Sequence, residues 1–325
     1  MNFDYSEEQK LLADSVVRFL NASYGFEARK KITEGEGWSP KVWATFAEMG
    51  LTGLPVSADH GGFGGGAVDL MGVMEAFGEA LVVEPLAATA IAARAIGRGA
   101  SDARKAAILP GVVEGKVKLG FGEKNAVLGA PVADYLVVAE PARLVLVERA
   151  RAKVDPYRTI DNMLAARVEY SASEPLGGVD DANDFGAALA CAEAVGAMKF
   201  ACDTTLEYLK TRKQFGVPIG TFQALQHRIV DMFVSYEQAK SMACLACSKV
   251  DSAESAKERA RAVSAAKIRI ADAARHVSQE AIQLHGGMGM SEEMKVSHTF
   301  RRLTVLARQF GDADHHLARF ASLAE

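Results

Sequence analysis

Cysteine is scarce in this sequence, and its distribution argues against a metal site. Four cysteines occur among 325 residues, all in alanine-rich segments typical of helices: Cys191, Cys202, Cys244 and Cys247. No second cluster stands at the spacing that would complete a zinc site. The last two have CxxC spacing, but no predicted strand precedes them, so we interpret them as buried helix residues.

Strong charge of either sign and long apolar runs are also missing. The formal net charge is −4 and the pI about 6.0, which gives no reason to expect nucleic acid as a partner. Uninterrupted apolar runs stay well short of the ~20 residues of a membrane span. The first residues, MNFDYSEEQK, are acidic and polar, unlike a signal peptide. We therefore expect a cytoplasmic protein without a membrane span.

The first third of the chain has helical signals. Ser6 to Gln9 has the pattern of a capping box, with apolar residues following at helical spacing. Ser39 and Pro40 predict the start of a second helix, which Gly50 ends. The glycine-rich run 61–66 predicts a loop, because glycine loses most entropy in a helix. Helix-like sequence returns at 68–98.

The remaining chain divides into a short β segment and a long helical one. YLVVAE, LVLVE and ARVEYSA are β-branched or alternating runs separated by turn residues. Apolar residues three and four apart then predict four long helices at 184–213, 221–250, 256–285 and 296–321. The predicted fold class is α+β and mostly α. It comprises an N-terminal helical domain (1–117), a small β domain (118–177) and a C-terminal four-helix bundle (178–325).

Motifs in this order resemble the acyl-CoA dehydrogenase family. Leu51–Pro55 running into His60–Gly64 is similar to the family's N-terminal loop. Thr211–Gly216 is close to the signature between two C-terminal helices. Gln283–Gly289 matches the family's Gln-x-x-Gly-Gly-x-Gly loop, and Arg301–Arg302 stand where the family often has Arg-Asp. The resemblance covers nearly the whole chain and is strongest from about residue 184 onwards.

The resemblance implies FAD as cofactor and assigns residues to it. An arginine fork and the backbone N–H groups of a glycine loop both suit a pyrophosphate. Arg212 would bind the phosphates, with Gln214 and Phe215 beside the adenosine. Backbone near Gln283, Gly286 and Gly287 would approach the dinucleotide closely. In the family this patch serves a flavin bound mainly by a neighbouring subunit. His285 is either a flavin contact or a packing histidine.

The family's catalytic base is missing. The reaction removes the α-proton of an acyl-CoA thioester, which needs a carboxylate near the α-carbon. Phe310 stands at the usual glutamate position, and Gly186 stands at the alternative position on the first C-terminal helix. A displaced base is the remaining option, and Asp312 is its first candidate. The others are Asp184, Glu193 and Asp314.

The middle domain also departs from the family pattern. Members use a Thr-Glu-Pro-x-x-Gly-Ser type segment to hold the flavin ring, whereas this chain has Gly120–Ala126 there. We therefore expect the dinucleotide end of the site to be kept and the reacting end to be lost.

Three readings of the function stay open. The first is a partner subunit in an α2β2 dehydrogenase, lending its flavin-binding residues to a longer catalytic paralogue, as in steroid side-chain catabolism. The second is a homomeric dehydrogenase that uses an unusual base. The third is a scaffold subunit without catalysis. Acyl-CoA is the implied substrate, and an electron-transfer flavoprotein is the family's usual electron acceptor.

Overall fold

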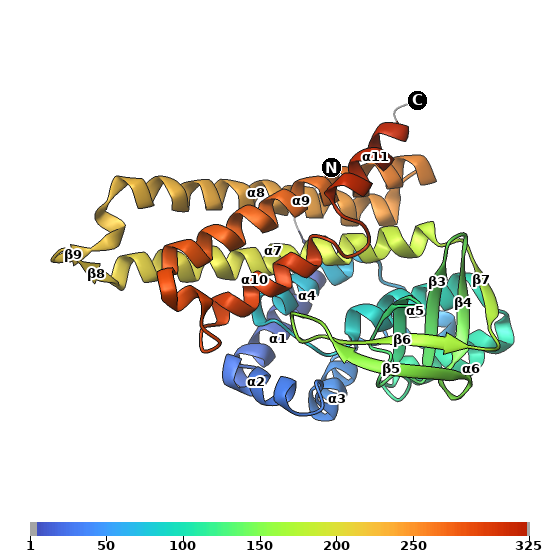
Figure 1. Cartoon of the computed structure of the whole chain (residues 1–325). Helices are drawn as coiled ribbons and strands as arrows, with labels where there is room; N and C mark the ends of the chain where they lie inside the picture. The colour runs from blue at the N-terminus through green and yellow to red at the C-terminus, as the bar shows by residue number, and fades with distance from the viewer. Residues whose placement is uncertain (1–4, 324–325) are drawn as a thin grey trace. The chain divides into compact units, whose positions relative to one another are not determined.

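The computed structural model describes residues 5–323, which form two compact units (Figure 1). Among the described residues, the helical unit comprises 5–26, 71–82 and 187–323, and the sheet unit comprises 27–70 and 83–186. Helices α4 (Ala67–Ala80) and α7 (Asp180–Thr211) begin in the sheet unit and continue into the helical unit. Each unit is described by itself.

The helical unit is built around α7 and α9. Helix α9 (Ala256–His285) packs against α8 (Gln223–Ser252), α10 (Lys295–Leu306) and α11 (Ala313–Ser322), and Figure 1 shows α8 and α9 side by side. Helix α1 (Glu7–Ser23) opens with the predicted capping box, in which Ser6 Oγ accepts from Gln9 N. Helix α7 is rich in alanine and is buried on nearly all sides over most of its length, as expected for a core helix.

Helix α7 is long and apolar enough to cross a membrane by length and composition alone. The apolar window within Asp180–Thr211 is 89% buried inside the protein. A helix that is hydrophobic all round is buried either in lipid or in a protein core, and here the rest of the chain covers it.

Helices α4 and α7 cross at two glycines. A Cβ on Gly78 would lie 1.9 Å from the Glu193 carbonyl oxygen, and one on Gly196 would lie 1.8 Å from the Glu75 carbonyl oxygen. Both distances are far below any real contact, so the two backbones approach as closely as they do only because neither residue has a side chain.

The sheet unit contains a seven-stranded sheet in the order β5-β6-β2-β1-β3-β4-β7. Only β1 and β3 pair in parallel; the other pairs are antiparallel. Valine, leucine and alanine from the central strands form its core, and α5 packs on β1 and β3. The strands are β1 (Leu119–Glu123), β2 (Ala126–Leu128), β3 (Tyr135–Glu140), β4 (Arg143–Glu148), β5 (Ala152–Arg158), β6 (Leu164–Tyr170) and β7 (Glu174–Gly177).

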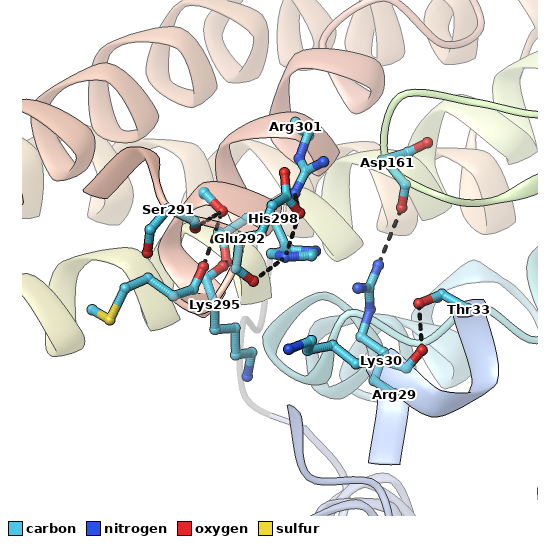
Figure 2. A network of polar contacts seen from close by, with 12 residues as sticks. Arg29, Lys30, Thr33, Asp161, Ser291, Glu292, Lys295, His298 and Arg301 are labelled. Carbon is cyan, nitrogen blue, oxygen red and sulfur yellow. Dashed lines mark hydrogen bonds and ion pairs between the residues drawn. The ribbon is translucent and has the colours of Figure 1, made fainter. Parts of the chain in front are cut away.

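Four further helices belong wholly or mainly to the sheet unit. They are α2 (Phe26–Glu34), α3 (Pro40–Glu48), α5 (Leu86–Gly99) and α6 (Asp102–Val113). Helix α3 starts as predicted, with Ser39 as N-cap and Pro40 in its first turn. Arg29 of α2 is buried and donates from Nη2 to the Asp161 carbonyl oxygen at 3.1 Å, which fixes the β5–β6 connection (Figure 2).

One of the four predicted long helices was wrong in extent, and the helix-like segment 68–98 is also divided. The segment 68–98 contains two helices, because Leu81 has a left-handed φ of 58° and Pro85 precedes α5. The segment 296–321 is also two helices, α10 and α11, because the backbone turns left-handed at Phe310 and Gly311. Apolar spacing continues across each break, so the periodicity alone does not reveal it.

An ion pair lies in the core of the helical unit. Arg302 of α10 donates from Nε and Nη2 to the two carboxylate oxygens of Glu193 on α7, both at 2.6 Å. Side-chain exposures are 6% and 5%, so both charges are removed from water. A bidentate pair satisfies the carboxylate with fixed geometry and joins α10 to α7.

Removing one partner of this pair should destabilise the protein strongly. We expect Arg302→Met to cost about 3–5 kcal/mol in the free energy of unfolding, because Glu193 would be left buried and unpaired. The double variant Glu193→Leu/Arg302→Met should recover most of the loss. Urea unfolding measures both; equal losses in the single and double variants would contradict this role.

Candidate functional site

The segment after α7 forms a short hairpin that presents Arg212. Strand β8 (Lys213–Gln214) pairs with β9 (Val217–Pro218), and Phe215 and Gly216 make the turn with φ of 54° and 82°. The backbone N–H of Arg212 donates to the Tyr208 carbonyl oxygen at 2.8 Å. Its carbonyl oxygen accepts from Ile219 N at 2.9 Å. The backbone of Arg212 is thus fixed on both sides, while its side chain is exposed.

The hairpin side chains predicted to contact adenosine face solvent. Gln214 is exposed, and Phe215 is 89% exposed, with its ring edge-on to Phe222 at 6.1 Å between centroids. Phe222 is also 40% exposed, so the two neighbouring rings form an apolar surface that suits coverage by another molecule.

The glycine loop follows α9 as the 3-10 turn η4 (Gly286–Met290). Gly286 has φ 62° and ψ −144°, a backbone conformation that only glycine adopts readily. A Cβ on Gly287 would meet no described atom within 4 Å, whereas one on Gly289 would come 2.6 Å from the Ile282 carbonyl oxygen. Packing therefore explains Gly289, while the open space beside Gly287 leaves room for a ligand's close approach. Gln283 is exposed one turn earlier.

A stacked pair of rings joins these two motifs. Tyr208, in the last turn of α7, stacks on His285, the last residue of α9, with centroids 4.5 Å apart and planes at 27°. The six residues predicted to bind the cofactor thus flank one contact at one end of the helical unit. Their role in binding stays a prediction: Arg212, Gln214, Phe215, Gln283, Gly286 and Gly287.

His285 is a buried neutral imidazole. Its Nδ1 lies 2.8 Å from the Ala281 carbonyl oxygen, which can only accept, so Nδ1 carries the proton. Nε2 is buried without a hydrogen-bond partner among the described residues. Burial lowers the pKa of the ring, since a protonated Nε2 would be an unsatisfied charge.

The loop predicted to correspond to the family's base position is held from two helices. Lys267 of α9 is buried and donates from Nζ to the carbonyl oxygens of Leu306 and Gln309, both at 2.8 Å. His316 of α11 donates from Nε2 to the Phe310 carbonyl oxygen at 3.0 Å. Phe310 itself is left-handed, with φ 61°. These contacts fix the loop with a phenyl ring where a carboxylate would be needed.

The predicted substitutes for the base have structural roles here. Asp312 is the N-cap of α11, and its Oδ1 accepts from His315 N at 2.9 Å. Glu193 is committed to Arg302 in the core. Asp184 is buried within α7, which begins at Asp180. Gly186 is also inside α7.

A cavity of about 510 Å³ lies beside this loop, between α9, α10 and the start of α11. Its charges are mixed: Arg275 and Arg308 oppose Asp272, Asp312 and Asp314. Because the arginines are outnumbered by carboxylates, the cavity has no net attraction for a polyphosphate.

The middle-domain segment that would hold a flavin ring is a tight hairpin. Glu123 on β1 pairs with Ala126 on β2, so only Lys124 and Asn125 make the turn. A Cβ on Gly122 would lie 2.1 Å from the Ala126 carbonyl oxygen, which excludes any larger residue. Beside it, the hydrogen bond from Arg143 holds the pKa of Glu140 at about 2. A two-residue turn provides no extended loop around a ring.

Sequence reasoning missed a polar network that holds the chain between η4 and α10 (Figure 2). His298 is buried, with Nε2 3.1 Å from the Glu292 carbonyl oxygen, and Arg301 donates to the Glu292 carboxylate at 2.8 Å. Tyr208, Lys267 and His316 were also missed. They lie on ordinary helical positions, and no spacing distinguishes them from other helix residues.

Comparison with known proteins identifies the family. The acyl-CoA dehydrogenase N-terminal domain matches residues 6–116, and the acyl-CoA dehydrogenase C-terminal domain matches 181–322. The chain belongs to the acyl-CoA dehydrogenase family, flavin oxidoreductases that act on CH–CH bonds and use FAD. It is similar to the acyl-CoA dehydrogenase IpdE2 of Mycolicibacterium smegmatis, at 30% identity over 97% of this chain and 98% of that protein.

Solved structures show the same fold and confirm the predicted fold class. The ChsE4–ChsE5 complex from Mycobacterium tuberculosis superposes with a TM-score of 0.90 at 23% identity, covering 100% of this chain and 99% of that one. The Tcur3481–Tcur3483 steroid ACAD G363A variant gives 0.89 at 23% identity over 98% of each chain. The FAD complex of PigA gives 0.84 at 24% identity, covering 99% and 98%.

His316 should make stability depend on pH. Burial lowers its pKa to about 4, below the ordinary value for histidine. The unfolded chain therefore binds the proton first as pH falls, and stability should decrease between about pH 6.5 and 4. We expect His316→Gln to flatten this slope in urea unfolding measured across that range. An unchanged slope in His316→Gln would refute the assignment.

Proposed function

We propose that this chain is the partner subunit of a heteromeric acyl-CoA dehydrogenase. In this proposal it binds the phosphate and adenosine half of an FAD whose flavin ring is held by a longer catalytic paralogue. One observation carries the proposal. The exposed dinucleotide-binding motifs are kept at one end of the helical unit, while the base position is occupied by Phe310 on a fixed loop.

The kept residues fit a pyrophosphate chemically. Arg212 offers a planar guanidinium on an immobilised backbone, which suits a bidentate contact with phosphate oxygens. Gly286 and Gly287 leave backbone open to a ligand. Gln214 and Phe215 supply an amide and an exposed ring for the adenosine. Gln283 adds a second amide at the start of the glycine loop.

The residues at the reacting end do not fit the family's chemistry. The reaction removes the α-proton of acyl-CoA and transfers a hydride from the β-carbon to FAD. Position 310 carries a phenyl ring in place of a carboxylate, Asp312 in the same loop caps α11, and the β1–β2 connection is too short to enclose a flavin ring. In the proposed heteromer, the partner subunit supplies the base and the ring pocket, and this chain supplies phosphate binding.

The relatives support both the heteromer and the substrate class. ChsE4–ChsE5 is a complex of two proteins, and Tcur3481–Tcur3483 is a steroid ACAD. We accordingly propose a steroid-type acyl-CoA as the substrate of the assembled enzyme, an electron-transfer flavoprotein as its electron acceptor, and the cytoplasm as its location.

Arg212 is the first residue to change. Co-expressed with its paralogous partner, the Arg212→Ala chain should yield a complex whose FAD dissociates at least about tenfold more readily, because a charge-assisted bidentate contact is lost. Flavin absorbance per mole of purified complex measures the loss. Arg212→Lys keeps the charge without the fork and should retain part of the flavin. Unchanged flavin content in Arg212→Ala would refute the assignment.

The glycine loop provides a matched pair for the same measurement. Gly287→Ala meets no clash in this chain, so it should preserve stability and still reduce FAD content. Gly289→Ala should instead lower stability, since its Cβ collides with the Ile282 carbonyl oxygen. If FAD content falls only in a variant that also loses stability, the loop has a packing role and the prediction is wrong.

The isolated chain separates the proposal from a self-sufficient dehydrogenase. Purified alone, it should be colourless, and acyl-CoA should produce no flavin bleaching; the co-expressed pair should be yellow and bleach. Asp312→Asn preserves the helix cap, because asparagine caps as well as aspartate, so it should leave the activity of the pair intact. The opposite outcome is an isolated chain that is yellow and bleaches with acyl-CoA. If the Asp312→Asn variant of that chain no longer bleaches, Asp312 is the base and the proposal is wrong.

A further inference from the structure

The stack between Tyr208 and His285 links two segments that the proposed function uses together. Their ring centroids are 4.5 Å apart, and the planes are inclined by 27°. Neither ring belongs to the residues expected to touch the phosphates. However, the Tyr208 carbonyl oxygen accepts a hydrogen bond from Arg212, and His285 directly precedes Gly286 in the chain. Arg212 and Gly286 are both among the residues expected to contact the phosphates.

On the α7 side, Tyr208 sets the position of Arg212. The Tyr208 carbonyl oxygen accepts from Arg212 N at 2.8 Å, and it lies 3.3 Å from the Thr211 hydroxyl, which also donates to it. Arg212 is the first residue beyond the helix, so this hydrogen bond determines where its side chain starts. A shift of Tyr208 along the helix end would move Arg212 with it.

On the α9 side, burial and a hydrogen bond fix the position of His285 immediately before the glycine loop. Its ring is 2% exposed and donates from Nδ1 to the Ala281 carbonyl oxygen at 2.8 Å. Its Cβ lies against Gly289, where an added Cβ would approach to 3.0 Å. Gly286 follows directly, and its N–H donates to the Gln283 carbonyl oxygen. A shift of the His285 backbone would therefore disturb the loop.

We propose that Tyr208 and His285 are positioning residues that set the separation of Arg212 from the Gly286–Gly287 backbone. This inference rests on the proposed function, because it assigns the pair to the same FAD half-site. The arginine fork and the backbone N–H groups must reach the same pyrophosphate, and displacing either by about 1 Å weakens the combined contact sharply.

The choice of histidine fits this role. A neutral imidazole stacks on the phenol ring and at the same time donates one hydrogen bond, whereas a phenylalanine would only stack. The buried Nε2, without a partner among the described residues, keeps the ring neutral and leaves the stack uncharged. The pair therefore remains in place at ordinary pH.

A double-mutant cycle tests whether Tyr208 acts through Arg212. FAD is titrated into the deflavinated heteromer carrying Tyr208→Ala, Arg212→Ala or both, and each complex is also unfolded thermally. We expect each single variant to weaken FAD binding at least about tenfold and the double variant to be no weaker than Arg212→Ala within about twofold. Tyr208→Phe keeps the ring and should bind FAD like the parent protein.

The outcomes are distinct. If the effects of Tyr208→Ala and Arg212→Ala multiply, Tyr208 does not act through Arg212 and the inference fails. If only Arg212→Ala weakens FAD binding, the inference fails while the proposed function stands. If Arg212→Ala changes nothing, both fail. Should Tyr208→Ala prevent assembly, His285→Leu replaces it in the same cycle, and the same outcomes decide.

Discussion

The close crossing of α4 and α7 is the constraint on which the helical unit depends. Gly78 and Gly196 bring two backbones together at distances that no side chain would permit. The carbonyl that faces Gly78 belongs to Glu193, whose side chain accepts the two hydrogen bonds from Arg302. One residue of α7 thus contacts α4 through its backbone and α10 through its side chain. The register of three helices is fixed at a single level of the unit.

The position of α7 in turn determines what its end can present. The helix is buried from Asp184 to Met198, and exposed residues recur from Lys199 to its last turn. Tyr208 there meets His285 at the end of α9, and the chain then turns into the β8–β9 hairpin. Helix packing thus brings together Tyr208 and His285, which are 77 positions apart, and the hairpin and loop extend from that contact.

The two halves of the predicted site therefore differ in structure. The predicted phosphate end consists of exposed groups on immobilised backbone, a combination that recognises a ligand without large rearrangement. Phe310 stands at the position predicted for the base, and the loop around it is tied by a buried lysine and a buried histidine. In the sheet unit, the segment at the predicted place of the ring-binding region is a hairpin. This division is the physical basis for proposing a partner subunit.

Local chemistry was enough to predict much of this from the sequence. Ser6, Ser39 and Pro40 mark helix starts because capping depends on neighbouring residues alone, and the β-branched runs became β3, β4 and β6. The motif order indicated the family, and the absence of a glutamate at 310 is a fact of sequence. The breaks after α4 and α10 could not be read in this way. They depend on left-handed backbone at Leu81 and Phe310, which apolar spacing does not encode.

Only the tertiary structure decided which polar residues are partners. Glu193 and Arg302 are 109 positions apart, and sequence alone offered Glu193 as a possible base rather than half of a buried ion pair. The same holds for Lys267 and His316, whose bonds to the Phe310 loop arise from the packing of α9 and α11. The sequence by itself determined the family and the residue types available. Which of those residues meet was set by long-range packing, because contacts between distant helices follow from the whole core.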